Sequence, residues 1–484
     1  MKGSNIKSKM GRFTFSACAL FLASGMFVAC EDELLTGTPS WLGSSIYDEL
    51  AKRGNFQTTL RLINDPEVST LNSDGQTEYR RMLGLTGSKT LFVANDEAYA
   101  RFFENNSWGA RSYDDLTQSQ KRTLFKSSML NNAYLIELMS SQSNNSANPT
   151  AGAVMRRSTE VSLYDSIPML YADDMPDNSF WSYYRSKYAQ KDGAGMLVMR
   201  DNTVSPMVHF ISDFMTSNQL TDEDLQFLTN GACQSIADSY INGQKLISRD
   251  ITCQNGYIQE VENVMEPLTN MAEAIRRDPT LTIFSSFLDR FCVPYYDQGA
   301  TNSYNQYNTS GQVDSVFVWK YFNDGFGTNG ENFKALTSYR NDNREDLLPY
   351  DPGWNLYENG AGGMEYGEDM GVILAPTDNA FEEYFRTKGK TLIDRFGSVD
   401  KIPDNIIIDM MDNFMKTSLV ATVPSKFSTV TNTAQMDMEL TTDKFDECIM
   451  ANNGVVYKAN EVFSVPEYQS VAFPASLDDS ITIM

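Results

Sequence analysis

Two stretches of this chain share one pattern, and that repeat constrains the fold more than any other feature of the sequence. Residues 90–103 read TLFVANDEAYARFF, and residues 372–385 read VILAPTDNAFEEYF. Each apolar run is typical of a strand and leads into a turn at Asn95-Asp96 or Thr377-Asp378, whose side chains can accept hydrogen bonds from the first N–H groups of a following helix. The pattern predicts a strand, a turn and a helix in both places.

Two further elements repeat in the same order. Asn255-Gly256 and Asn453-Gly454 are tight-turn signals, and each is followed by an extended run that ends near a proline. A helix is expected to open each unit, with apolar residues at helical spacing. These residues are Phe56, Leu60 and Ile63 in the first unit and Leu281, Phe284 and Phe287 in the second. Three elements repeated in one order predict two homologous domains.

These motifs resemble those of the fasciclin family. The family's strand-to-helix motif reads roughly T-L-F-A-P-T-D-E-A-F, and the copy from Ala375 to Phe381, APTDNAF, is the more specific match. The resemblance implies an α+β fold with two tandem fasciclin-like domains, each a β-sandwich wedge with short packed helices, plus large insertions. It also implies a binding or adhesion module and leaves the partner open.

The spacing of the repeated motifs shows where each copy is enlarged. The interval from Asp96 to Asn255 is longer than that from Asp378 to Asn453, so the first domain carries extra residues in its second half. The expected divisions are a signal peptide at 1–29, an acidic tether at 30–43, domain 1 at 44–267 with an insertion near 140–223, domain 2 at 268–468 with an insertion near 292–369, and a tail at 469–484. Because the insertions differ between the copies, we expect them to carry the functional differences.

The N-terminus predicts an export signal. Four basic residues precede an apolar run from Phe13 to Ala29, which is short for a membrane-spanning helix. Its end, Ala29-Cys30, resembles the lipobox of bacterial lipoproteins, which implies cleavage before Cys30 and lipidation of that residue. The acidic cluster Glu31–Glu33 is similar to the surface-export signal of Bacteroidetes lipoproteins. The prediction is a lipid-anchored outer-membrane protein exposed at the cell surface; the alternatives are an ordinary signal peptidase site and a solvated tether.

Composition excludes several kinds of chemistry. The formal net charge of −24 repels nucleic acid. His209 is the one histidine, so a site that needs two imidazoles is excluded, and its apolar neighbours favour a structural role. We therefore expect no catalytic residue, no metal and no cofactor. The four cysteines beyond Cys30 allow Cys233–Cys253 and Cys292–Cys448 bridges, but free buried thiols are slightly favoured; they are Cys233, Cys253, Cys292 and Cys448.

Aromatic residues are concentrated in the insertion of the second domain, from Tyr295 to Asp369, among Asn, Gly and Asp. Such a mixture suits either the apolar face of a sugar or a protein partner, although packing within the domain is the default. A strand is expected at residues 315–322, with Phe317 and Trp319 packed. The turn Asp351-Pro352-Gly353 would present aromatic residues near a loop tip. The predicted ligand-binding residues are Tyr339, Tyr350, Trp354, Tyr357 and Tyr366.

The sequence thus predicts a surface lipoprotein that acts as an adhesion or binding module and not as an enzyme. Its partner would be another outer-membrane lipoprotein or a SusC/SusD-like nutrient importer, of which it would be an accessory subunit, or a glycan. The alternative is a surface glycan-binding protein or a carbohydrate-active enzyme that uses a pair of carboxylates, since no spacing excludes such a pair among 63 acidic residues.

Overall fold

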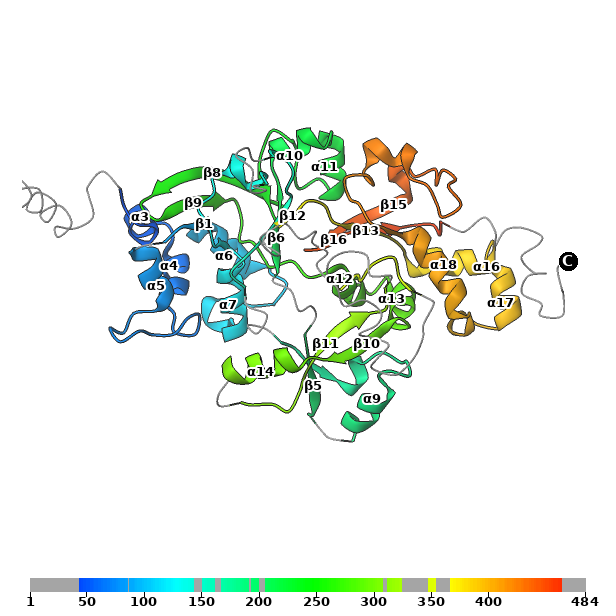
Figure 1. Ribbon diagram of the computed structural model, residues 1–484. Helices are drawn as coiled ribbons and strands as arrows, with labels where there is room; N and C mark the ends of the chain where they lie inside the picture. Colours follow the sequence, from blue (N-terminus) through cyan, green and yellow to red (C-terminus); the bar gives the residue numbers. More distant parts are fainter. Residues whose placement is uncertain are drawn as a thin grey trace, which may run out of the picture. The chain divides into compact units, whose positions relative to one another are not determined.

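One arrangement of four strands occurs twice along the chain (Figure 1). The computed structural model describes residues 43–85, 87–142, 150–161, 167–190, 193–199, 205–307, 311–323, 347–353 and 366–463. The first copy has the order β2 (Met129–Leu130), β1 (Lys89–Ala94), β9 (Gly256–Val261) and β8 (Gln244–Cys253). The second has the order β14 (Met415–Lys416), β13 (Gly371–Pro376), β16 (Gly454–Ala459) and β15 (Phe445–Met450). We call residues 44–267 the first repeat and 268–468 the second.

The register of the central strands is also the same in the two repeats. β1 pairs with β9 in parallel, with Lys89 opposite Gly256, and β13 pairs with β16 in parallel, with Gly371 opposite Gly454. All six residues of β1 and of β13 are buried, as expected for central parallel strands that read as continuous apolar runs. A Cβ at Gly256 would lie 1.8 Å from the Lys89 carbonyl oxygen, so this close approach requires glycine.

Short helices complete each repeat. The first contains α3 (Ile46–Arg53), α4 (Gln57–Asn64), α5 (Glu78–Gly84), α6 (Asp96–Glu104), η2 (Tyr113–Asp115), α7 (Gln118–Lys126) and α8 (Ile136–Met139). The second contains α12 (Met271–Arg277), α13 (Thr282–Asp289), α16 (Asp378–Arg386), α17 (Lys390–Phe396), η4 (Val399–Lys401), α18 (Asp404–Phe414), η5 (Pro424–Thr429) and η6 (Thr442–Lys444). This mixture of small sheets and short helices confirms the α+β fold.

The predicted turns are helix caps. The Asn95 side chain accepts a hydrogen bond from the Ala98 N–H (3.0 Å), and the Thr377 side chain accepts one from the Ala380 N–H (3.4 Å). One expectation is wrong: the helices that follow Phe56 and Leu281 do not open their repeats. They are α4 and α13, and α3 and α12 precede them.

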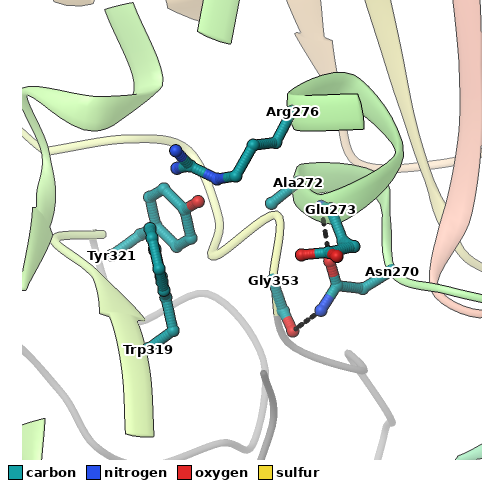
Figure 2. Close-up of a pocket in the computed structure, with 7 residues that line it drawn as sticks. All are labelled: Asn270, Ala272, Glu273, Arg276, Trp319, Tyr321 and Gly353. Atoms are coloured by element: carbon teal, nitrogen blue, oxygen red, sulfur yellow. Dashed lines mark hydrogen bonds between the residues drawn. The ribbon is translucent and has the colours of Figure 1, made fainter. Parts of the chain in front are cut away.

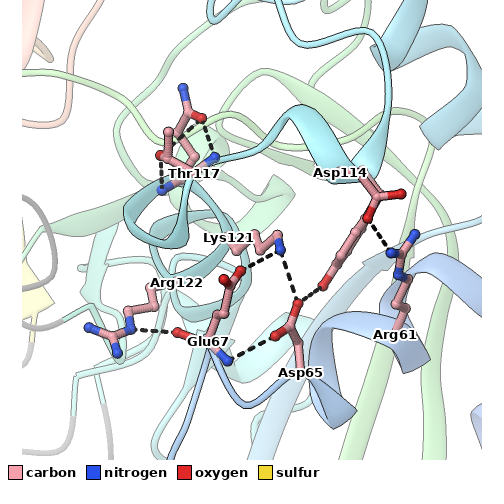
Figure 3. A network of polar contacts seen from close by, with 9 residues as sticks. Arg61, Asp65, Glu67, Asp114, Thr117, Lys121 and Arg122 are labelled. Atoms are coloured by element: carbon pink, nitrogen blue, oxygen red, sulfur yellow. Dashed lines mark hydrogen bonds and ion pairs between the residues drawn. The ribbon is translucent and has the colours of Figure 1, made fainter.

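A polar network joins helices of the first repeat (Figure 3). The Asp65 carboxylate accepts a hydrogen bond from the Tyr113 hydroxyl (2.6 Å) and lies 3.2 Å from the Lys121 ammonium group, which also donates to Glu67 (2.5 Å). Burial by itself would raise the pKa of Asp65, but these hydrogen bonds and the Lys121 charge outweigh it and lower that pKa. The network holds the end of α4 against η2 and α7.

The insertion of the first repeat extends the first sheet and contacts the second repeat. From the first repeat, β3 (Arg156–Ser158), β6 (Pro206–Phe210) and β7 (Tyr240–Ile241) extend the sheet beyond β8, and β12 (Tyr366–Gly367) of the second repeat pairs with β3 at the outer edge. Two helices follow β6, namely α10 (Ser212–Ser217) and α11 (Asp222–Leu228). Figure 1 shows α11 beside β15. The Asn230 amide donates to the Cys448 carbonyl (2.7 Å) and accepts from its N–H (2.8 Å). This pair of bonds occupies backbone groups on an edge strand.

A third sheet is built from both insertions, and the sequence did not predict it. Its order is β10 (Cys292–Tyr296), β11 (Val316–Tyr321), β5 (Gly195–Met199) and β4 (Met169–Tyr171). β5 comes from the first repeat and pairs in parallel with β11 from the second. We call this the joint sheet; the neighbouring elements are η3 (Ala172–Asp174), α9 (Ser182–Tyr188) and α14 (Gln298–Tyr307). The described residues from Ser45 onwards form one compact unit.

Candidate functional site

The structure places Tyr350 in the core and corrects its predicted role in ligand binding. Tyr350 is 0% exposed, and its hydroxyl donates to the Val372 carbonyl (2.9 Å). The turn that follows is tied inwards, because the Asp351 carboxylate accepts from the N–H groups of Tyr321 (3.1 Å) and Gly353 (2.8 Å). The side chain of Tyr350 therefore faces the interior of the second repeat, where no ligand in solvent can contact it.

Of the other predicted site residues, Tyr366 is the one that the structure describes. Tyr366 lies half-buried on β12, where its hydroxyl accepts a hydrogen bond from the Gln142 side chain (2.8 Å). Tyr339, Trp354 and Tyr357 lie outside the described residues, and so does Cys30. Within the described ranges, no helix is both long and apolar enough to cross a membrane.

One face of the joint sheet forms a hollow with α12 and the Asp-Pro-Gly turn (Figure 2). The hollow is open to solvent, and its empty space, solvent included, is about 240 Å³. Its lining residues are Asn270, Ala272, Glu273, Arg276, Trp319, Tyr321 and Gly353. Apart from Trp319, Tyr321 and Gly353, none of these belongs to a motif that the sequence singled out.

Arg276 is fixed in position at the edge of the hollow. Its guanidinium group forms two hydrogen bonds with the Asp289 carboxylate and lies 4.3 Å from the ring centre of Trp319. Burial would lower the pKa of Arg276, but Tyr321 and Asp289 together raise it, so the group stays charged. Figure 2 shows this side chain extended over the rings of Tyr321 and Trp319. The geometry gives a preorganised cation beside an aromatic surface.

The side chain of Trp319 is packed, as predicted for this residue of the strand, because it contacts the ring of Trp181. The ring centres of Trp319 and Trp181 are 4.7 Å apart, and Trp181 is the N-cap residue of α9. The Trp181 indole N–H donates to the Cys292 carbonyl of β10 (3.2 Å). Trp319, which lines the hollow, is therefore packed against a residue of the other insertion.

The hydrogen-bonding capacity of Asn270 is used within the protein. Its amide donates to the Gly353 carbonyl (2.9 Å), and its side-chain oxygen caps α12 by accepting from the Glu273 N–H (2.8 Å). Glu273 in turn pairs with Arg277 (2.7 Å). The polar groups around the hollow thus hold the turn against α12, which is a positioning role.

The joint sheet carries exposed hydrophobic side chains. Four of the nine large hydrophobic residues that are exposed in the described part of the chain lie on its strands or on α9, namely Met169, Tyr171, Tyr183 and Tyr296. Exposed apolar groups gathered in one region are typical of interaction surfaces. Tyr296 belongs to the aromatic insertion, whereas the other three belong to the insertion of the first repeat, where the sequence marked no binding residue.

The histidine and the four described cysteines are buried in the core. His209 lies fully buried in β6, and burial together with the nearby Arg157 charge lowers its pKa well below the usual value. Cys233, Cys253, Cys292 and Cys448 are free and buried. Burial raises the pKa of Cys233 to about 11 and that of Cys253 to about 12, so neither forms a thiolate at neutral pH. Across the described ranges, no three potential metal ligands cluster.

Comparisons with known proteins found a similarity in structure but no match in sequence. No family model matches the sequence, and no curated protein matches it. Among solved structures, the protein is similar to a FAS1 domain pair from the insect cell adhesion molecule fasciclin I, with a TM-score of 0.22 and 8% sequence identity. That match covers 87% of this chain and 100% of the other. The case for a tandem arrangement therefore rests on the duplicated strands, registers and caps of this chain itself.

Proposed function

We propose that this chain is a lipid-anchored protein of the outer-membrane surface, built on two fasciclin-like domains, that binds a partner and does not transform a substrate. The observation that carries the proposal is the joint sheet. Two insertions that have no counterpart in one another pair strand to strand, and the sheet that they form carries exposed hydrophobic side chains. An insertion on a duplicated scaffold is where a binding surface is expected.

The state of the reactive side chains supports binding over catalysis. A general base must be able to reach the proton that it abstracts, and a thiol must ionise to act as a nucleophile. The imidazole of His209 and the four free thiols are buried. Binding by rigid aromatic and apolar groups requires neither capability.

The anchor is tested by metabolic labelling with an alkyne fatty acid. We expect label on the wild type and none on Cys30→Ala, while Cys18→Ala, which alters the other cysteine of the leader, keeps the label. Protease added to whole cells should degrade the wild type if it faces outwards. A labelled Cys30→Ala variant, or full protection in intact cells, would contradict the surface lipoprotein.

The partner is tested by affinity capture of the full chain from detergent-solubilised outer membrane. Among the possible partners, we favour a SusC/SusD-like importer, with this chain as an accessory subunit. Stoichiometric recovery of a TonB-dependent porin would support that role. Recovery of a different lipoprotein would support surface assembly and reject the importer, and recovery of no protein would reject both and leave a free adhesin.

A further inference from the structure

Four aromatic rings form a continuous strip on the joint sheet. The ring of Tyr183 contacts that of Tyr184 with centres 5.2 Å apart, and Tyr184 contacts Phe317 at 5.1 Å. Phe317 contacts Tyr296, its partner across the β10–β11 pair, at 5.9 Å. The interplanar angles of 82°, 71° and 63° are those of edge-to-face contacts, which aromatic pairs prefer.

The two ends of the strip are exposed and its centre is anchored. Tyr183 is 66% exposed and Tyr296 is 38% exposed, whereas Phe317 is buried. Tyr183 and Tyr184 belong to α9 in the first repeat, and Phe317 and Tyr296 belong to the second. Pairing of the two insertions is therefore what assembles the strip, and the packed centre fixes the exposed rings in place.

Polar side chains border the strip at its β10 end. The Tyr296 hydroxyl donates to the Gln298 side-chain oxygen (2.6 Å), and the Gln298 amide donates to the Asn302 side-chain oxygen (2.9 Å). Gln298 and Asn302 lie exposed on α14. An amide side chain both donates and accepts hydrogen bonds, which is the capacity needed to bind hydroxyl groups.

The charges near the strip favour an uncharged ligand. On α9, Arg185 pairs with Asp177, and the Lys187 ammonium group lies 5.1 Å from the ring centre of Tyr188. Both cations are thus already engaged within the protein. The formal net charge of the chain is −24, and this field repels anions that approach the surface.

We infer that the strip from Tyr183 to Tyr296 binds an uncharged oligosaccharide. The apolar faces of the sugar rings would lie on the exposed tyrosines, and the sugar hydroxyls would exchange hydrogen bonds with Gln298 and Asn302. This inference rests on the proposed binding function and names the ligand class for the joint sheet. The rim of amides distinguishes the strip from a purely apolar protein-docking patch.

The test uses the full chain in detergent on a glycan array that carries uncharged oligosaccharides and oligosaccharides rich in uronic acids. Wild type is expected to bind uncharged members, and Tyr183→Ala and Tyr296→Ala should each weaken that binding at least about tenfold. Tyr171→Ala is the matched control. Tyr171 is 47% exposed and lies on the same face of the joint sheet as Met169. Met169 pairs with Leu197, whereas the next residue, Val198, pairs with Phe317 of the strip. Successive residues of a strand point to opposite faces of the sheet. Tyr171 therefore lies on the other face of the sheet, and Tyr171→Ala should bind as wild type does.

Three results would overturn the inference. They are failure of wild type to bind any uncharged oligosaccharide, unchanged binding by both strip variants, and a preference for the uronic-acid members. Thermal unfolding of each variant provides the folding control, since removal of an exposed ring should leave the melting temperature within a few degrees. If the array fails while affinity capture recovers a membrane protein, the strip is rejected and the surface-binding function stands; if both fail, both are rejected.

Discussion

Phe317 on β11 and Val198 on β5 lie opposite one another in a parallel strand pair. The first residue belongs to the insertion of the second repeat and the second to the insertion of the first, so this pairing fuses two separate additions into one sheet. Both side chains belong to the hydrophobic core that also contains the strands of the second repeat. A ligand bound on this sheet would contact both halves of the chain.

His209 should make the protein less stable in acid. Burial and the Arg157 charge lower its pKa in the folded state, so the unfolded chain takes up the proton first as the pH falls below 6.5. Neither ring nitrogen has a hydrogen-bond partner within the described part of the chain. In His209→Leu this proton uptake is absent, and we expect the variant to gain up to about 1.4 kcal/mol relative to wild type for each pH unit below that point.

The measurement for His209 is urea unfolding at pH 8 and at pH 5. At pH 8 the imidazole is neutral in both states, and the two proteins should differ by no more than about 1.5 kcal/mol because the side chains are of comparable size. Parallel loss of stability by both proteins between the two pH values would show that other groups dominate.

Asp96 and Asp378 should stabilise the two repeats in the same way. Asp96 accepts hydrogen bonds from the N–H groups of Gln57 and Thr58 (both 2.9 Å) at the start of α4, and Asp378 accepts one from the Ile283 N–H (2.8 Å) at the start of α13. Replacement of either aspartate by alanine leaves N–H groups of the first helical turn without an acceptor. We expect each replacement to lower the unfolding free energy by about 1 to 2 kcal/mol.

Neighbouring residues provide the controls for this pair. Glu97 and Asn379 follow the two aspartates and are exposed, so Glu97→Ala and Asn379→Ala should change the unfolding free energy by less than about 0.5 kcal/mol. Equal effects at both positions of a pair, measured by urea unfolding, would refute the capping role.

Cys233, Cys253, Cys292 and Cys448 should react only after unfolding. All are buried and free, and their raised pKa values suppress the thiolate. A chromogenic disulfide reagent should modify none of them rapidly in the native protein and all four in denaturant without reductant. Two or fewer reactive thiols in denaturant would mean that disulfide bonds form in the protein.

The local parts of the fold could be predicted from the sequence. Asn95 and Thr377 act as caps because capping depends on residues a few positions away, and the repeat made the pattern visible twice. No local pattern in the sequence predicts the strand pairing of the joint sheet. β5 and β11 pair across a long sequence separation, and nothing in either strand alone specifies its partner.

The direction in which the Asp-Pro-Gly turn points could not be predicted from the neighbouring residues either, because it depends on a contact with a residue far away in the sequence. Asn453 donates to the Pro352 carbonyl (2.9 Å), just as Asn255 of the first repeat donates to the Leu83 carbonyl (2.9 Å). The turn therefore takes the position that the end of α5 occupies in the first repeat, and Tyr350 is drawn into the core with it. Alignment of the two asparagines is the one signal that could have shown this.

The central claim is that the joint sheet is the surface that meets the partner. The direct measurement is photo-crosslinking in living cells, with a photoreactive residue at Tyr296 on β10 or at Met436 in the second repeat, positions that are 38% and 43% exposed. The account predicts crosslinked products from position 296 and none from position 436. Products from position 436 alone would contradict it.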